Sequence, residues 1–174
     1  MAGIYASLSR TLNHYSTQDG SYTESDFRSL NYYADFTPPE LTYSSQKGLL
    51  NAASIWLTYQ SLLEVNRPSE EIGWHLFSSA RKVTWKTGTS FGFRDAWAVG
   101  TDPGYVVAVW AGNADGEGRP GLTGLNAAAP LMFELFDLLP PSDWFDKPFD
   151  EMTKVAVCRH SGYRAGPNCE LTDS

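Results

Sequence analysis

Apolar residues recur at helical spacing at the start of the chain. An amphipathic helix is predicted over residues 2–15 because five apolar residues share one face: Ile4, Tyr5, Leu8, Leu12 and Tyr15. The segment from Ser16 to Lys47 is polar and aromatic with little periodicity, and it predicts a loop with one short strand. A loop of this length in a compact domain is usually functional or belongs to a larger structure.

A wider apolar stripe predicts a second helix from Leu49 to Val65. Its packed face is formed by Ala52, Ile55, Trp56, Tyr59, Leu62 and Leu63. Ser44 or Ser45 is expected to cap its start, and Pro68 stands beyond its end.

Three strand-like runs joined by short turns follow, namely Arg81–Trp85, Arg94–Gly100 and Tyr105–Trp110. They predict an antiparallel meander. A third helix is predicted over Asn126–Leu139, with Pro130 tolerated near its first turn. The fold class expected is therefore α+β, an antiparallel sheet flanked by helices.

Composition and charge argue against some classes of binding partner. The chain has 174 residues, enough for one domain, and a formal net charge of −7 at pH 7. This acidity argues against duplex DNA and anionic lipid as partners, since both need a basic surface. No apolar run approaches the ~20 residues needed to span a bilayer, and the start lacks the features of a signal peptide.

The stretch Lys86-Thr87-Gly88-Thr89 carries the candidate chemistry, at the end of the first strand-like run. An ammonium and two hydroxyls are suited to hold a carboxylate, and a glycine lets a ligand backbone approach closely. Lys-Thr-Gly occurs with Ser-x-x-Lys in penicillin-binding proteins and serine β-lactamases. A strand-edge lysine in an ordinary turn is the plainer interpretation.

One Ser-x-x-Lys is present, Ser44-Ser45-Gln46-Lys47, and a lysine one turn after a serine can take the serine's proton. The order of the parts argues against this role, because no Ser-x-Asn lies between Lys47 and Lys86. We therefore interpret Ser44 as a helix cap, and keep a small serine hydrolase using Ser44 and Lys47 as an alternative.

Two further patterns carry less weight. Gly116 to Gly121 matches G-x-G-x-x-G, but the strand end and acidic residue that a dinucleotide site needs are misplaced. Cys158, His160 and Cys169 offer three zinc ligands at an unusual spacing without a fourth. A disulfide or two free thiols is favoured for Cys158 and Cys169, and no cofactor or metal is expected.

Residues 86–100, which begin Lys86-Thr87-Gly88, closely resemble the transpeptidase domain of the penicillin-binding protein 1C family, which belongs to the bifunctional class A penicillin-binding proteins. The resemblance continues through Val109–Gly116 and Thr123–Pro130 and is strongest over residues 81–139. Ala2–Asn13 looks like the helix that follows the family's second motif. Val157–Arg159, with Cys169, looks like the start of the family's C-terminal module.

The resemblance implies a partial transpeptidase fold over residues 1–140, with a linker and the start of a C-terminal module over 141–174. It implies that Lys86, Thr87, Gly88 and Thr89 bind the carboxylate of a peptidoglycan stem peptide, or a β-lactam, and that the nucleophile lies upstream. The backbone N–H of Thr89 would then help to form the oxyanion hole.

The parent protein would be a periplasmic serine-type D,D-transpeptidase with an upstream glycosyltransferase domain and an N-terminal membrane anchor. This chain alone is expected to be inactive and, as a half-domain, to self-associate through exposed apolar surface. The other alternative is a non-catalytic partner-binding module built on the same sheet.

Overall fold

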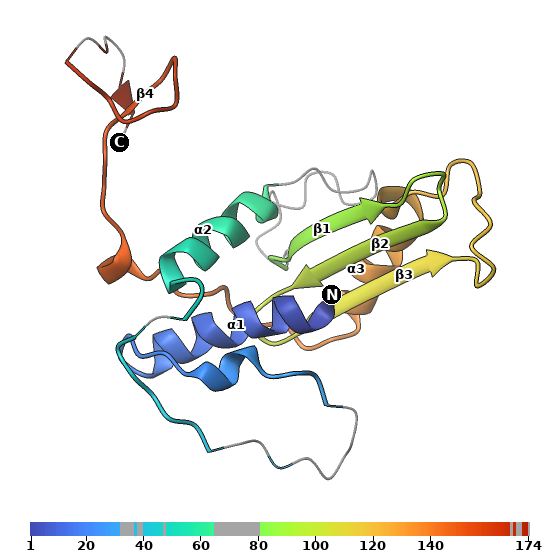
Figure 1. Ribbon diagram of the computed structural model, residues 1–174, viewed down its shortest axis with the longest axis horizontal. Helices are drawn as coiled ribbons and strands as arrows, with labels where there is room; N and C mark the ends of the chain where they lie inside the picture. Colours follow the sequence, from blue (N-terminus) through green and yellow to red (C-terminus); the bar gives the residue numbers. More distant parts are fainter. Residues whose placement is uncertain are drawn as a thin grey trace.

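The computed structural model describes residues 1–31, 37, 40–46, 48–64, 81–167, 169 and 172–173. A three-stranded antiparallel sheet of order β1-β2-β3 lies between two helical layers (Figure 1). Its strands are β1 (Thr84–Thr89), β2 (Asp95–Thr101) and β3 (Val106–Gly112). The meander and the α+β fold class are thus confirmed.

The Lys-Thr-Gly stretch lies in the second half of β1, which agrees with its predicted place at the end of the first strand. The ladder with β2 continues beyond Trp85 through Lys86↔Val99 and Gly88↔Trp97 to Thr89↔Ala96. Side chains alternate between the faces of a strand, so Lys86 and Gly88 share one face of the sheet and Thr87 and Thr89 the other.

One layer packs on the face that carries Trp85 and Thr87. A π-helical turn, η4 (Gly124–Ala128), leads into α3 (Ala129–Asp137), with Pro130 in the first turn as predicted. Met132 and Phe136 pack against β2 at Gly100, where an added Cβ would lie 2.8 Å from both side chains. Glycine at this position therefore permits close helix–sheet packing. The core of this layer consists of Val83, Trp85, Ala96, Ala98, Ala128, Ala129, Met132, Phe133 and Phe136.

The other layer consists of α1 (Ala2–Thr17) and α2 (Ala52–Leu63). Their shared core contains Leu12, Tyr15, Tyr22, Ala52, Ile55, Tyr59 and Phe145. The predicted face of α1 is wrong at Ile4, which is 64% exposed. A buried polar contact joins the layer to the sheet, because the Ser9 hydroxyl lies 2.9 Å from that of Thr101.

The start of α2 corrects the capping prediction. Asn51 is the N-cap, and its side-chain oxygen accepts from the backbone N–H of Ser54 over 3.0 Å. Ser44 does not cap this helix. Val65 and Pro68 lie outside the described residues.

The apolar stripe of α2 is covered rather than exposed. Ile55, Tyr59 and Leu63 are buried, which contradicts the expectation that a half-domain leaves this stripe open. Leu49, just before the helix, is 89% exposed.

The segment between α1 and α2 contains η1, a 3₁₀ turn over Glu24–Phe27. In place of the predicted short strand, Tyr22 and Ser44 form an isolated antiparallel bridge through two backbone hydrogen bonds of 2.8 Å.

The segment after α3 returns to the helical layer of α1 and α2. Phe145 is buried in their core, and the Trp56 indole N–H donates to its carbonyl oxygen over 3.3 Å. A 3₁₀ turn, η5 (Phe149–Glu151), follows. The chain then leads to β4 (Val157–Cys158), which pairs with β5 (Thr172–Asp173) in a small unit that projects away from the sheet (Figure 1).

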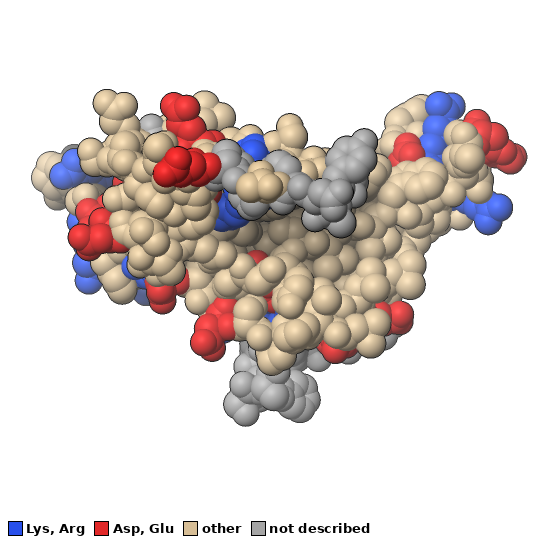
Figure 2. Space-filling view, turned by 90° about the horizontal axis from the view of Figure 1, so that it is seen from below, with Lys and Arg blue, Asp and Glu red and all other residues tan. Residues whose placement is uncertain are grey.

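Charged side chains are unevenly placed on the surface. On the face in Figure 2, Lys, Arg, Asp and Glu gather mainly toward the two ends, and uncharged residues form most of the middle. Among the described residues, none of the helices has the length and hydropathy that crossing a bilayer requires.

Candidate functional site

The candidate site lies on an edge of the sheet. β1 pairs with β2 alone, and in the part of the chain that the structure describes, no strand pairs with its other edge. An unpaired edge presents a row of N–H and C=O groups to which an extended peptide can add as a further strand.

The ladder determines which backbone groups face this edge. The Ser90 N–H donates to the Asp95 carbonyl oxygen over 2.9 Å, so Ser90 and Asp95 form a hydrogen-bonded pair. Bonded and non-bonded pairs alternate along an antiparallel ladder, so Gly88 bonds to β2 while Thr87 and Thr89 direct their N–H and C=O groups outward. The edge therefore offers two backbone positions to a ligand.

Lys86 is exposed beside these groups, and its Nζ donates to the outward carbonyl oxygen of Thr87. No carboxylate of the described residues forms an ion pair with it. A charge left in solvent at the strand edge remains accessible to an anionic ligand. Lysine also discourages unwanted pairing at an exposed edge, which is the plainer role.

Thr87 and Thr89 share the face of β1 that η4 approaches. The Thr89 hydroxyl accepts a hydrogen bond from the backbone N–H of Gly124 over 3.0 Å. This contact uses a lone pair and leaves the hydroxyl proton free to donate, because no acceptor for it occurs among the described residues. The sequence pattern did not single out Gly124.

Gly88 differs from the glycines around it. A Cβ added at Gly124 would lie 2.4 Å from the Trp97 carbonyl oxygen, so that glycine is needed for packing. A Cβ at Gly88 would meet only the Trp97 Cβ, at 3.9 Å, and Gly88 has no positive φ. Packing and backbone conformation within the described residues therefore do not require glycine at this position, and the strand surface there is bare.

The hairpin after the motif holds the end of β1. The Asp95 N–H donates to the Ser90 hydroxyl over 2.8 Å, and the Trp110 indole N–H donates to the Asp95 carboxylate over 2.9 Å. The Trp110 and Ser90 hydrogen bonds lower the pKa of Asp95. At the hairpin tip, Phe91 is 97% exposed.

The Ser-x-x-Lys alternative gains no support from the geometry of Ser44. Its hydroxyl accepts from the Gln46 N–H over 3.2 Å, closing a local turn. Lys47 lies outside the described residues. The described cavities lie elsewhere than the Lys86–Thr89 edge, and one of them, lined in part by Ser44, is treated below.

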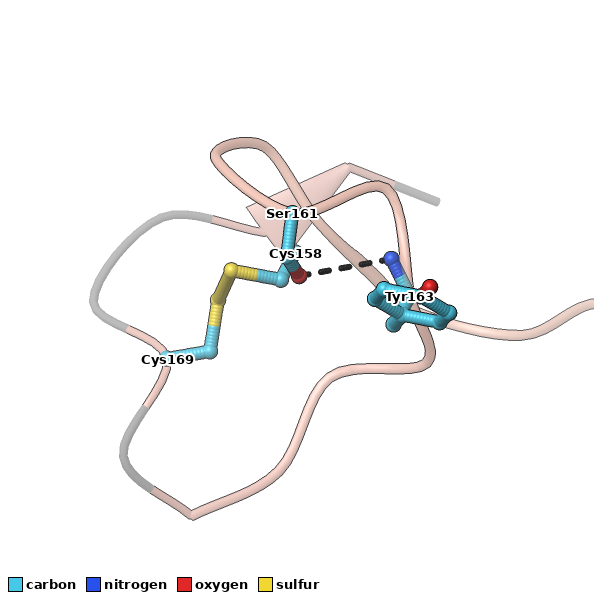
Figure 3. Close-up of a disulfide and its surroundings, with 4 residues drawn as sticks. All are labelled: Cys158, Ser161, Tyr163 and Cys169. Atoms are coloured by element: carbon cyan, nitrogen blue, oxygen red, sulfur yellow. Dashed lines mark hydrogen bonds between the residues drawn. A yellow bond between two sulfur atoms is a disulfide. The ribbon is translucent and has the colours of Figure 1, made fainter.

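The two cysteines are joined, as Figure 3 shows. The Cys158–Cys169 disulfide spans a Cα–Cα distance of 5.9 Å, and the Ser161 hydroxyl accepts from the Tyr163 N–H over 3.3 Å in the enclosed loop. A disulfide sulfur is not a thiolate ligand, so the three-ligand zinc interpretation fails. Across the residues that the structure describes, no group of three or more His, Cys, Asp or Glu side chains is placed to hold a metal.

The structure also reveals a contact between a partly exposed histidine and a buried carboxylate. His14 Nδ1 lies 2.6 Å from the Asp26 carboxylate, which is fully buried beneath α1. Burial raises the pKa of Asp26, and the His14 imidazole opposes this effect. This contact, together with the packing of the His14 ring against Tyr43, gives His14 a structural role.

Comparison with known proteins relates the chain to a penicillin-binding protein. It is 30% identical over 94 residues to penicillin-binding protein 1C of Escherichia coli (strain K12). The match covers 54% of this chain and 12% of that protein, so the chain spans only a small part of its relative. No family model matches the chain.

Proposed function

We propose that this chain is the C-terminal, substrate-binding half of a D,D-transpeptidase domain, and that the Lys86–Thr89 edge binds the terminal carboxylate of a peptidoglycan stem peptide. The observation that carries the proposal is the bare surface at Gly88, on a strand edge with which no described strand pairs. Glycine in a strand costs about 0.5–1 kcal/mol relative to alanine, and internal packing does not require it here. Close approach of a ligand backbone would explain why glycine occupies this position.

The groups around Gly88 have complementary roles. The Lys86 ammonium supplies positive potential, and Thr87 and Thr89 supply hydroxyl donors from one face of the strand. The Thr89 proton is available because its oxygen already accepts from Gly124. The N–H of Thr89 is directed outward from the edge, where it would stabilise a developing oxyanion.

The chemistry requires parts that this chain does not contain. In the parent protein a serine from an upstream Ser-x-x-Lys attacks the carbonyl of the penultimate D-Ala, forming an acyl-enzyme and releasing the terminal D-Ala. An amine of a second stem peptide then accepts the acyl group, and β-lactams acylate the same serine. The parent would act in the periplasm, anchored upstream of this segment and carrying a glycosyltransferase domain.

The proposed division of the chain places this half-domain over residues 1–140 and the start of another module over 141–174. Alone, the chain is expected to self-associate. Exposed apolar side chains such as Phe91 and Leu138 support this expectation, whereas the covered stripe of α2 does not. Sedimentation velocity across a concentration series measures it, and a monomer at every concentration would contradict it.

Fluorescent penicillin tests the proposed function. The 174-residue chain should remain unlabelled, and a product extended upstream through a Ser-x-x-Lys should be labelled. In that longer product, Lys86→Ala should lower the acylation rate constant at least about tenfold, or ~1.4 kcal/mol. Lys82→Ala is the matched control, an exposed lysine before β1, and should change the rate less than about twofold.

The alternatives predict other results. Labelling of the 174-residue chain that Ser44→Ala abolishes would replace the proposal with a small serine hydrolase using Ser44 and Lys47. Absence of labelling in the longer product would favour a non-catalytic partner-binding module. Equal rates in Lys86→Ala and Lys82→Ala would overturn the role of the strand edge.

A further inference from the structure

A cavity of about 530 Å³ lies beside α1, and none of its described lining residues belongs to β1. Its described walls come from α1, from the residues around η1 and from residues 42–44, 46 and 48. The Tyr22–Ser44 bridge joins these segments. Its volume lies within the range of small-ligand sites, which is roughly 300–1,000 Å³.

The cavity is rich in hydroxyl groups and aromatic rings. Six of its ten described lining residues carry a hydroxyl group, and these are Thr11, Tyr22, Thr23, Thr42, Tyr43 and Ser44. Glu24 adds a carboxylate, Gln46 an amide and Phe27 a second accessible ring. The cavity therefore combines flat apolar faces with groups that both donate and accept hydrogen bonds.

Several of these groups are available to a ligand. The side chains of Glu24, Thr42 and Gln46 make no hydrogen bond to another described residue, and all three are exposed. Phe27 and Tyr43 are 45% and 37% exposed, so part of each ring remains uncovered.

The ring of Tyr43 is positioned by packing against His14. The two rings pack edge-on, with centroids 5.9 Å apart, and His14 is anchored to the buried Asp26 carboxylate. A ring that is already positioned loses little entropy when a ligand stacks on it. The His14–Asp26 pair thus positions one wall of the cavity.

From this lining we infer that the cavity binds a neutral hexopyranose sugar. A pyranose ring has a face of C–H groups, which packs on aromatic rings, and a rim of hydroxyls, which pair with carboxylate and amide groups. Tyr43 and Phe27 supply the stacking surfaces, and Glu24 and Gln46 supply the polar partners. The inference is independent of the transpeptidase proposal, since no residue is shared with the β1 edge.

The test uses the full 174-residue chain with N-acetylglucosamine as the probe. Saturation-transfer NMR should detect transfer to the sugar, with a dissociation constant on the order of millimolar. Tyr43→Ala should weaken binding about tenfold because it removes a stacking surface, whereas Tyr43→Phe keeps the ring and should stay within about twofold.

A second variant provides a test that remains valid if Tyr43→Ala does not fold. Glu24→Gln changes one exposed side chain and should weaken binding at least about threefold by removing a charged acceptor. Absence of saturation transfer to wild type would overturn the inference. So would equal affinity of wild type and Glu24→Gln, or of Tyr43→Ala and Tyr43→Phe when both melt at the wild-type temperature.

Discussion

The Thr89 hydroxyl accepts a hydrogen bond from the backbone N–H of Gly124 over 3.0 Å, across 35 residues of sequence. Gly124 is buried against the sheet, where an added Cβ would lie 2.7 Å from the Gly88 carbonyl oxygen. The contact joins the start of η4 to the last residue of β1. It therefore orients a side chain of the candidate site from a segment far along the chain.

Replacing Thr89 tests this contact. Thr89→Val keeps the shape but leaves the buried Gly124 N–H without an acceptor, which should lower the free energy of unfolding by about 1–3 kcal/mol. Thr89→Ser keeps the hydroxyl and should lose less than half as much. Urea unfolding followed by tryptophan fluorescence measures both variants, and equal losses would show that the hydrogen bond is unimportant.

The glycines of the sheet should respond differently to alanine. Gly88→Ala should leave stability unchanged or raise it by up to about 1 kcal/mol, because its Cβ has open space. Gly100→Ala places a Cβ against Met132 and Phe136 and should cost about 1–3 kcal/mol. Thermal unfolding by circular dichroism compares them. A larger loss in Gly88→Ala than in Gly100→Ala would contradict the bare-surface argument.

A buried ion pair joins the ends of β2 and α3. Arg81 lies 2.5 Å from the Asp102 carboxylate and donates to the Phe136 carbonyl oxygen at the end of α3. Asp102→Ala removes the buried carboxylate that faces the Arg81 charge and should cost about 3–5 kcal/mol. Lys82→Met, at an exposed position, should cost less than about 0.5 kcal/mol in the same urea titration. Similar losses in the two variants would rule out a structural role for the pair.

Stability should fall at alkaline pH because burial raises the pKa of Tyr59 above its ordinary value of 10.0. Above pH 10 the unfolded chain releases this proton while the folded chain keeps it, so the slope of unfolding free energy with pH is negative. The contribution is fully present below pH 10 and is lost as pH rises toward the folded pKa.

Tyr59→Phe isolates this group from Tyr15 and Tyr22, whose pKa values burial also raises. The variant should be less stable at pH 8 by about 1 kcal/mol, since it loses hydrogen bonds to Ser9 and the Tyr5 carbonyl oxygen. Its urea midpoint should then fall less than that of wild type between pH 8 and pH 11. An equal fall would refute the assignment to Tyr59.

The disulfide should matter only to the C-terminal unit. Ellman titration of the native chain should detect no free thiol, and two after reduction, since Cys158 and Cys169 are joined. The main unfolding transition should be unchanged by reduction, because neither cysteine belongs to a core cluster. Two reactive thiols in the unreduced chain would contradict the pairing.

Local pattern predicted most of the elements. Apolar periodicity located α2, and short apolar runs separated by turns located the three strands. Pro130 was correctly expected in the first turn of α3. The predicted N-cap of α2 was wrong because several polar residues precede the helix. Tertiary packing decided that Asn51, rather than Ser44, caps it.

The sequence alone determined the candidate chemistry. The ammonium of Lys86, the hydroxyls of Thr87 and Thr89 and the absence of a side chain at Gly88 are the same in any fold. Only the tertiary structure decided what these groups can reach. It placed the Thr87 and Thr89 backbone on an edge with which no strand of the described residues pairs, brought Gly124 to Thr89 and left Gly88 exposed. Such relationships join residues far apart along the chain, so they depend on how the layers pack and not on local spacing.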